Sequence, residues 1–244
     1  MRAMEINTAR VKRYIDLRQG EGASNGTINR ELAALKRMMK LGAEETPPKV
    51  DRVPHIPMLK EADPRKGFFE HQDYLKILKE LPSEIRGIVT FGYCTGCRKG
   101  EILGLTWDRA DLKERTVRFE AGDTKNSKGR TIYLDDELLK LLRLQNLRRQ
   151  QGCRYVFHRK GKKITDFRGV WKKACKVAEV EGKLFHDLRR TGVRDMIRAG
   201  IPQVVAMKIS GHLTPSVFDR YNVVNTDDLK DAATKLGAYR QEQK

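Results

Sequence analysis

Residues 186–200 read HDLRRTGVRDMIRAG, a stretch that predicts a helix from His186 to Ala199 with Gly200 as its stop. The spacing of three residues places His186 and Arg189 side by side on one face of this helix. An imidazole and a guanidinium placed in this way can reach one anion together. The stretch therefore predicts a helical domain that can bind an anion.

Helical patterns also dominate the sequence on either side of this stretch. In TINRELAALKRMMKLGA, apolar residues recur at helical spacing from Ile28 to Met39, with Thr27 as the expected N-cap and Gly42 as the expected stop. Apolar periodicity and the positions of Gly and Pro predict further helices over His71–Leu81, Ser83–Tyr93, Asp136–Gln150, Thr165–Glu179 and Pro202–Ile209, and others that begin near Arg98, Thr214 and Thr226.

Two short runs rich in β-branched and aromatic residues, Thr116–Glu120 and Thr131–Leu134, interrupt the helical pattern. The segment GDTKNSKG between them is rich in turn formers and lysine, so the two runs predict a β-hairpin with a basic tip. The fold class that follows is mainly α with a small antiparallel β-hairpin or sheet, which is an α+β arrangement.

The segment between Glu44 and Gly67 contains five of the eight prolines, many charges and little periodicity. This composition favours an extended, semi-rigid linker over packed structure. The expected organisation is therefore a short helical domain over residues 1–45, a linker over residues 46–67 and a larger domain over residues 68–244.

The charge balance indicates the class of partner. Fifty Lys and Arg against 32 Asp and Glu give a net charge of +18, which is typical of proteins that neutralise a polyanion such as nucleic acid. The longest charge-free stretch, Gly87 to Cys97, is too short for a membrane helix, so we expect no membrane partner and a cytoplasmic location. The cysteines include one CxxC, Cys94 and Cys97, but no second close pair and no histidines at zinc-finger spacing, so no metal site is expected.

The larger domain carries motifs that resemble, in order and spacing, those of the tyrosine recombinases of the phage-integrase family. TGCRKGEILGLTW resembles the first-arginine box, HDLRRTGVRDMIRAG resembles the second box, and ISGH followed by FDRYNVV resembles the final box. The resemblance covers nearly all of residues 68–236 and implies six catalytic residues, with Glu101 as a supporting carboxylate: Arg98, Lys125, His186, Arg189, His212 and Tyr221. Lys128 lies close to Lys125 and competes with it for the role of the hairpin lysine.

These residue types suit the cleavage of a phosphodiester. A phenol has a reference pKa of about 10, so Tyr221 needs nearby cations or a base before it can act as a nucleophile at neutral pH. Arg98 and Arg189 would clamp the non-bridging oxygens of the phosphate through their forked guanidiniums. His212 would add a donor to the phosphate, and His186 would accept the phenol proton or serve as a further donor.

The leaving 5′-oxygen needs a proton, which Lys125 on the hairpin tip would deliver. By resemblance, the product is a 3′-phosphotyrosyl link that preserves the energy of the phosphodiester until another strand reverses it. Neither ATP nor a metal nor any other cofactor is therefore expected, and the sequence contains no GxxxxGK[ST] phosphate loop. The expected reaction is site-specific DNA recombination of the integration or excision type.

The resemblance also implies partners: double-stranded DNA attachment sites, three further copies in a homotetramer on DNA, and an accessory DNA-bending protein. The C-terminal helix at about residues 227–236 either packs on a neighbouring protomer or folds back on its own domain. Residues expected to contact DNA are Arg30, Lys36 and Arg37 on the N-terminal helix, and Lys128 and Arg130 near the hairpin. A solvated helix face is the simpler explanation for the first three.

Two other functions share part of this evidence. A topoisomerase of type IB uses the same chemistry and relaxes supercoils without partner strands, whereas a catalytically silent DNA-binding regulator would form no covalent adduct. All six catalytic positions carry the expected residue, which favours an enzyme. Residues 1–45 resemble only the latter part of the helical core-binding domain of the family, so a truncated, a degraded and a naturally minimal protein remain alternatives.

Overall fold

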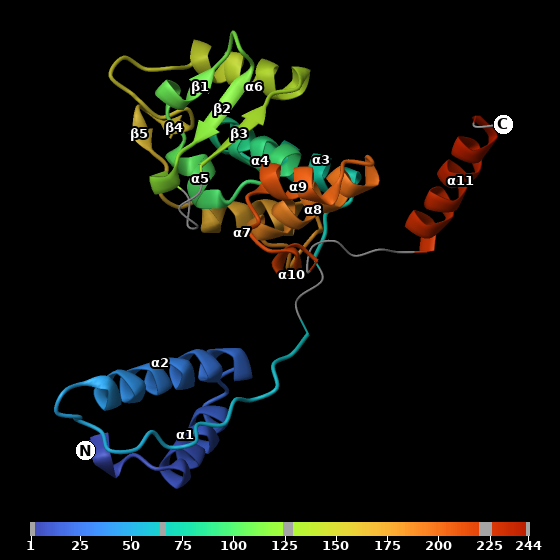
Figure 1. Cartoon of the computed structure of the whole chain (residues 1–244). Coiled ribbons are helices and arrows are strands. Elements are labelled where there is room, and N and C mark those ends of the chain that lie inside the picture. The colour runs from blue at the N-terminus through green and yellow to red at the C-terminus, as the bar shows by residue number, and fades with distance from the viewer. Residues whose placement is uncertain (1–2, 64–66, 124–128, 220–225, 243–244) are drawn as a thin grey trace. The chain divides into compact units, whose positions relative to one another are not determined.

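The computed structural model describes residues 3–63, 67–123, 129–219 and 226–242 (Figure 1). The chain divides into two compact units, Met1–Arg65 and Lys66–Lys244. In the part of the chain that the structure describes, no helix is both long and apolar enough to cross a membrane.

The smaller unit is built on two helices, α1 (Thr8–Gly20) and α2 (Asn25–Glu44), after a 3-10 turn over Ala3–Glu5. Helix α2 begins earlier than the sequence suggested, because the Ser24 hydroxyl and not that of Thr27 caps it, accepting from the Thr27 amide at 3.3 Å. It also continues through Gly42 to Glu44. Helix α1 was not predicted, since it buries only Val11 and Ile15 and its other positions carry many charges.

Residues 46–63 contain no regular secondary structure, yet they are not a free spacer. Ile56 is buried in the same apolar cluster as Val11 and Ile28. The buried side chain of Asn29 donates to the Leu59 carbonyl oxygen and accepts from the Leu59 amide, each at 2.8 Å. The segment expected as a linker therefore packs along the smaller unit at least as far as Leu59. The Asn29 side chain satisfies both the amide and the carbonyl oxygen of Leu59, as a paired strand would in a sheet.

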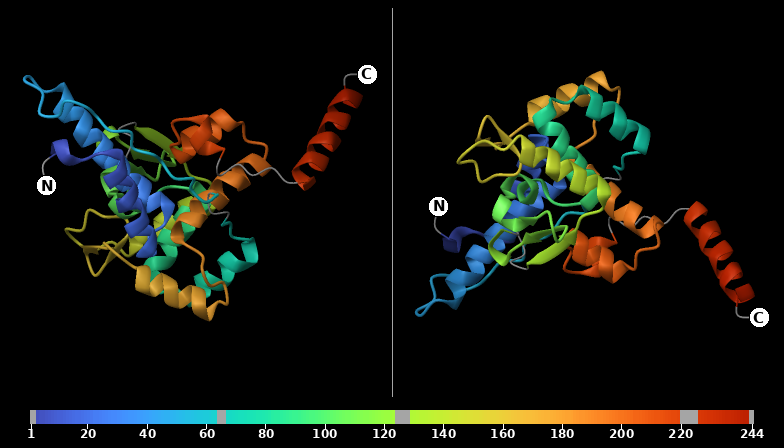
Figure 2. Two further views of the ribbon diagram at one scale, coloured as in Figure 1. Left: turned by 90° about the horizontal axis from the view of Figure 1, so that it is seen from below. Right: turned by 90° about the horizontal axis from the view of Figure 1, so that it is seen from above.

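The larger unit is mainly helical, and α4 (Ser83–Thr95) and α8 (Phe185–Arg198) pack against each other in its interior (Figures 1 and 2). Helix α3 (His71–Glu80) packs on α7 (Arg168–Val177), and α6 (Asp136–Leu147) packs on α4. The remaining helices are α5 (Lys99–Gly104), α9 (Gln203–Ser210), α10 (Pro215–Phe218) and α11 (Thr226–Glu242), with 3-10 turns over Trp107–Arg109 and Ala121–Asp123.

Two small antiparallel sheets complete this unit. Strands β2 (Thr116–Phe119) and β3 (Arg130–Tyr133) pair with Val117 opposite Ile132, and β1 (Ala110–Asp111) adds to the free edge of β2. Strands β4 (His158–Arg159) and β5 (Lys162–Lys163) form a second hairpin. The expected fold class, mainly α with small antiparallel sheets, is confirmed, and the predicted helices of this unit lie within three residues of the observed bounds.

Candidate active site

The first part of the site is the turn between α4 and α5. Gly96 adopts a left-handed conformation with φ of 64° and ends α4, so the chain reverses and Arg98 becomes the N-cap of α5. Glu101, one helical turn later, accepts from the Arg98 backbone amide and from its Nη1 atom, each at 2.9 Å. Arg98 also donates from Nη2 to the carbonyl oxygen of Gly211 at 3.1 Å. The turn thus ties the first-arginine box to the chain just before His212.

Glu101 is a buried carboxylate shared by two guanidiniums. Its oxygens accept from Arg130 Nη2 at 2.6 Å and from Arg130 Nη1 at 3.2 Å, in addition to the contacts with Arg98. Burial alone would raise the pKa of Glu101, but the hydrogen bonds and charge of Arg130 and the bonds from Arg98 outweigh it and lower the pKa. Glu101 is therefore an anion that holds both arginines.

Arg130 lies in a different environment from the one expected of a DNA-contacting residue. Its side chain is only 7% exposed, and besides Glu101 it contacts the carbonyl oxygen of Ile209 through Nε at 3.0 Å. The guanidinium carbon lies 4.7 Å from the centre of the Phe119 ring. These contacts direct most of the Arg130 donors into the protein, and the assignment of Arg130 to DNA contact stays a prediction.

Arg189 is the most deeply buried charged residue of the site, with 2% exposure. Its Nη1 donates to the carbonyl oxygens of Gly96, at 2.6 Å, and Ser210. Helix α8 approaches α4 closely enough for this only because residue 192 is glycine, since a Cβ there would lie 2.9 Å from the Gly96 nitrogen and 3.0 Å from the Tyr93 oxygen. Arg98 and Arg189 therefore hold the same Ser210–Gly211 turn from two sides.

His212 is 5% exposed and lies between Arg189 and Ser210. Its Nε2 is 2.9 Å from Arg189 Nη2, and its Nδ1 is 2.8 Å from the Ser210 hydroxyl oxygen. A guanidinium has no acceptor, so Nε2 accepts and the ring proton lies on Nδ1. The Ser210 hydroxyl donates in turn to the Ala206 carbonyl oxygen at 2.7 Å. Ser210 thus fixes the tautomer, a role that the sequence reasoning missed although ISGH shows a hydroxyl two residues before the histidine.

Burial and the surrounding cations together keep His212 neutral. Burial lowers its pKa to about 3, and the positive charges of Arg189, Arg98 and Arg130 act in the same direction. The expected role as a donor to phosphate needs a proton on Nε2. That role therefore requires His212 to exchange its bond with Arg189 for one with the phosphate.

His186 is the second residue of the helix that carries Arg189, and the residue as a whole is exposed. Desolvation of the ring lowers its pKa, and the charges of Arg189, Arg190 and Arg98 lower it further. A neutral imidazole at neutral pH is suited to accept a proton. The structure therefore favours the acceptor among the two roles considered for His186.

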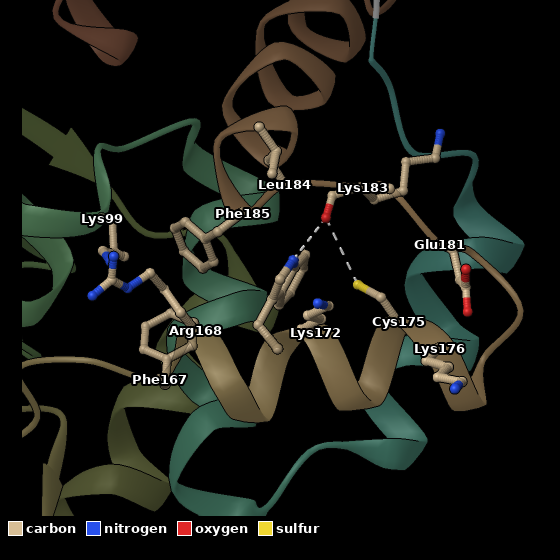
Figure 3. A pocket seen from close by; sticks show the side chains of 12 residues that line it. Lys99, Phe167, Arg168, Lys172, Cys175, Lys176, Glu181, Lys183, Leu184 and Phe185 are labelled. Carbon is tan, nitrogen blue, oxygen red and sulfur yellow. Dashed lines mark hydrogen bonds between the residues drawn. The ribbon is translucent and has the colours of Figure 1, made fainter. Parts of the chain in front are cut away.

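A pocket of about 570 Å³ lies between α7, Lys99 and the loop Glu181–Phe185 (Figure 3). The carbonyl oxygen of Lys183 in this loop accepts from Trp171 Nε1 at 2.9 Å and from the Cys175 thiol at 3.9 Å. The Phe185 ring packs edge to face with the rings of Phe167 and Trp171, with centroids at 5.3 and 5.7 Å respectively. Phe185 is the first residue of α8 and directly precedes His186, so this packing anchors the start of that helix.

A second groove of about 600 Å³ runs beside the site, between β3, α9 and the turn at Gly211, and Arg98 and His212 line it. In the smaller unit, Arg30, Lys36 and Arg37 are exposed on α2. Lys125, Lys128 and Tyr221 lie outside the described residues. The structure thus brings together Arg98, Glu101, His186, Arg189 and His212 of the predicted set.

Comparison with known proteins identifies the class. Residues 67–227 match the family model described as the phage integrase family, so the chain belongs to that family. It is similar to the integrase of Salmonella phage P22, with 22% identity over 227 residues, covering 88% of this chain and 58% of the relative. The chain therefore spans less than two thirds of that relative.

The fold has matching solved structures. The integrase of the Tn1549 transposon in complex with circular intermediate DNA superposes with a TM-score of 0.77 and 15% identity, covering 96% of this chain and 86% of the other. A lambda integrase tetramer bound to a Holliday junction gives a TM-score of 0.69 with 15% identity, and the match covers 89% of this chain and 65% of the lambda integrase chain. These likenesses establish the fold of both parts of the chain.

Proposed function

We propose that this chain is a site-specific DNA recombinase, which cleaves and rejoins DNA strands through a 3′-phosphotyrosyl intermediate with Tyr221 as the nucleophile. The observation that carries the proposal is the meeting of three separate motifs at one turn. Arg98 and Arg189 both donate to carbonyl oxygens of Ser210–Gly211, and His212 follows directly. Two guanidiniums and two neutral histidines in one place suit a reaction at a phosphodiester.

The proposed chemistry distributes the charge of the transition state over these groups. In-line attack by the Tyr221 oxygen builds negative charge on the non-bridging oxygens, which Arg98 and Arg189 would stabilise. His186, neutral at physiological pH, would accept the phenol proton. Lys125 would then protonate the leaving 5′-oxygen, with Lys128 as the alternative donor. No cofactor enters this scheme.

The proposed partners are double-stranded DNA and further copies of the chain. The net charge of +18 supports a polyanionic partner. The tetramer on a Holliday junction formed by lambda integrase supports a homotetramer on DNA. Helix α11 carries exposed Leu229 and Leu236 seven residues apart, which supports packing of about residues 227–236 against a neighbouring protomer.

The N-terminal unit is proposed to be a partial core-binding domain that clamps DNA. Its exposed cations on α2, Arg30, Lys36 and Arg37, are candidates for phosphate contacts. The catalytic domain would then comprise residues 68–244. The proposal gives the two units different tasks, with the smaller one contributing affinity and the larger one chemistry.

Covalent capture tests the proposal and selects the attachment site in the same experiment. The full chain is incubated with a pool of duplexes of random sequence, each with a sulfur atom at the bridging 5′ position of one phosphate. A thiol has a much lower pKa than an alcohol, so this leaving group departs without a proton donor and the adduct accumulates. Denaturing electrophoresis isolates the adduct, and sequencing of its DNA gives the preferred site.

The proposal predicts an adduct with wild-type protein and none with Tyr221→Phe, which removes a single oxygen atom. The control measures binding of both proteins to the selected duplex, which should be equal. DNA binding without an adduct in either protein would refute the enzymatic function and favour a silent DNA-binding regulator. An adduct in Tyr221→Phe would show that another residue is the nucleophile. Relaxation of supercoiled plasmid without recombination would indicate a topoisomerase.

A further inference from the structure

Arg130 connects three segments that are far apart in the sequence. It is the first residue of β3, at the end of the segment that contains Lys125. Its guanidinium contacts Glu101 of α5, the carbonyl oxygen of Ile209 in α9 and the sulfur of Cys97, at 3.4 Å. The described contacts use four of the five N–H donors of an arginine. No residue with fewer donors could make all of them.

The shape of the surrounding protein is fitted to this guanidinium. The Phe119 ring supports it from one side. On the other side, a Cβ at Gly211 would lie 2.9 Å from Arg130 Nη1, so only glycine leaves room for it there. The paired oxygens of Glu101 receive Nη1 and Nη2 side by side, which is the forked geometry that a lysine cannot reproduce.

These contacts set the spacing between the groups proposed to bind the phosphate. Glu101 holds Arg98 with the same two oxygens that hold Arg130. Ile209, whose carbonyl oxygen Arg130 contacts, lies three residues before His212 and two residues before Gly211, whose carbonyl oxygen Arg98 contacts. Without Arg130, the buried carboxylate of Glu101 would have Arg98 as its remaining charged partner, and the turn before His212 would lose one of its anchors.

We propose that Arg130 is a positioning residue for strand cleavage, which fixes Arg98 through Glu101 and the His212 turn through the carbonyl oxygen of Ile209. This inference rests on the proposed recombinase function. Arg130 itself touches no substrate in this scheme. Its effect is on the rate of the chemical step, because a displacement of about 1 Å in a catalytic group can cost about 100-fold in rate.

The test uses the full chain and a duplex that the wild-type protein has selected by covalent capture. In Arg130→Lys, adduct formation at saturating DNA should slow by about 10- to 100-fold, while the Kd for the same duplex stays unchanged. The matched control is Arg118→Lys, since Arg118 lies in the paired strand β2 with an exposed side chain, and its rate should equal that of wild type. A parallel loss of rate and affinity would instead make Arg130 a DNA-contacting residue and overturn the proposal.

A double-mutant cycle tests whether Arg130 acts through Glu101. If it does, Arg130→Lys combined with Glu101→Gln should lose less rate than the product of the two single losses, because, of the two proposed routes, only the contact with Ile209 is independent of Glu101. Fully multiplicative losses would overturn the proposed route. If Arg130→Lys does not fold, Phe119→Leu replaces it, because this variant loosens the guanidinium and keeps its polar partners; an unchanged cleavage rate in that protein would refute the inference. Absence of any wild-type adduct would refute the recombinase function itself.

Discussion

The buried imidazole of His212 should make the larger unit less stable in mild acid. In the folded protein its pKa is lowered to about 3, first by burial and then by Arg189 and Arg98, whereas the unfolded chain has a histidine pKa of about 6.5. At pH 7.5 both states are neutral and the group contributes nothing. Below pH 6.5 the unfolded state binds a proton that the folded state refuses, so the free energy of unfolding falls with pH.

The size of the effect follows from the two pKa values. Between pH 7.5 and 5.5, only the unfolded state gains a proton at this position, which costs about 1.4 kcal/mol of stability. Further loss continues at about 1.4 kcal/mol for each pH unit until the folded pKa is approached. His186 shifts in the same direction, so the comparison must isolate His212.

Urea unfolding followed by tryptophan fluorescence provides the assay. Both tryptophans, Trp107 and Trp171, lie in the larger unit, so the signal reports that unit without the smaller one. The variant His212→Gln keeps an acceptor for Arg189 and cannot be protonated, and it should lose about 1.4 kcal/mol less than wild type between the two pH values. Equal losses in the two proteins would refute the assignment of a neutral, buried imidazole.

Three further predictions concern other parts of the chain. Gly67→Ala should lower the stability of the larger unit by about 1–3 kcal/mol in urea unfolding, because a Cβ would lie 2.7 Å from the buried carboxylate of Asp187; an unchanged midpoint would contradict this packing. The rate of adduct formation should fall as pH drops through the lowered pKa of His186, below 6.5, and His186→Gln should lose this acid limb. For each tenfold rise in salt concentration, the log of the DNA-binding constant should fall by about 0.9 per phosphate contact. Arg30→Gln and Arg37→Gln should each make this fall smaller. An unchanged salt dependence in both variants would leave the two residues on a solvated face.

Most helices of the larger unit could be predicted because their signals are local. Amphipathic spacing and a Gly or Pro at the boundary, such as Gly211 after α9 or Pro215 at the start of α10, act within a few residues. The two-residue strands β1, β4 and β5 could not be predicted, since so short a run becomes a strand only through its partner. The packing of residues 46–63 depends on contacts with distant residues, such as the burial of Ile56 and the bonds between Asn29 and Leu59, which sequence periodicity does not reveal.

Part of the candidate site could likewise be predicted from the sequence, and part could not. The motifs identified the side chains Arg98, Arg189 and His212, because residue type and order suffice for that. They did not reveal that Arg130 is buried, since an arginine after a lysine-rich hairpin tip is equally consistent with DNA contact. Nor did they give the tautomer of His212, which depends on the distances to two groups that its own position does not specify.

One physical cause connects the histidines to the proposed nucleophile. Three guanidiniums, those of Arg98, Arg130 and Arg189, converge on the turn before His212, and the carboxylate of Glu101 pairs with two of them, so the centre keeps an excess of positive charge without DNA. Burial lowers the pKa of His212, and this excess of positive charge lowers it further by opposing protonation. The same field favours any anion that enters it, which applies to a scissile phosphate and to a phenolate alike. A tyrosine brought to this centre would therefore ionise more easily, and the neutral His186 would be the group that takes its proton.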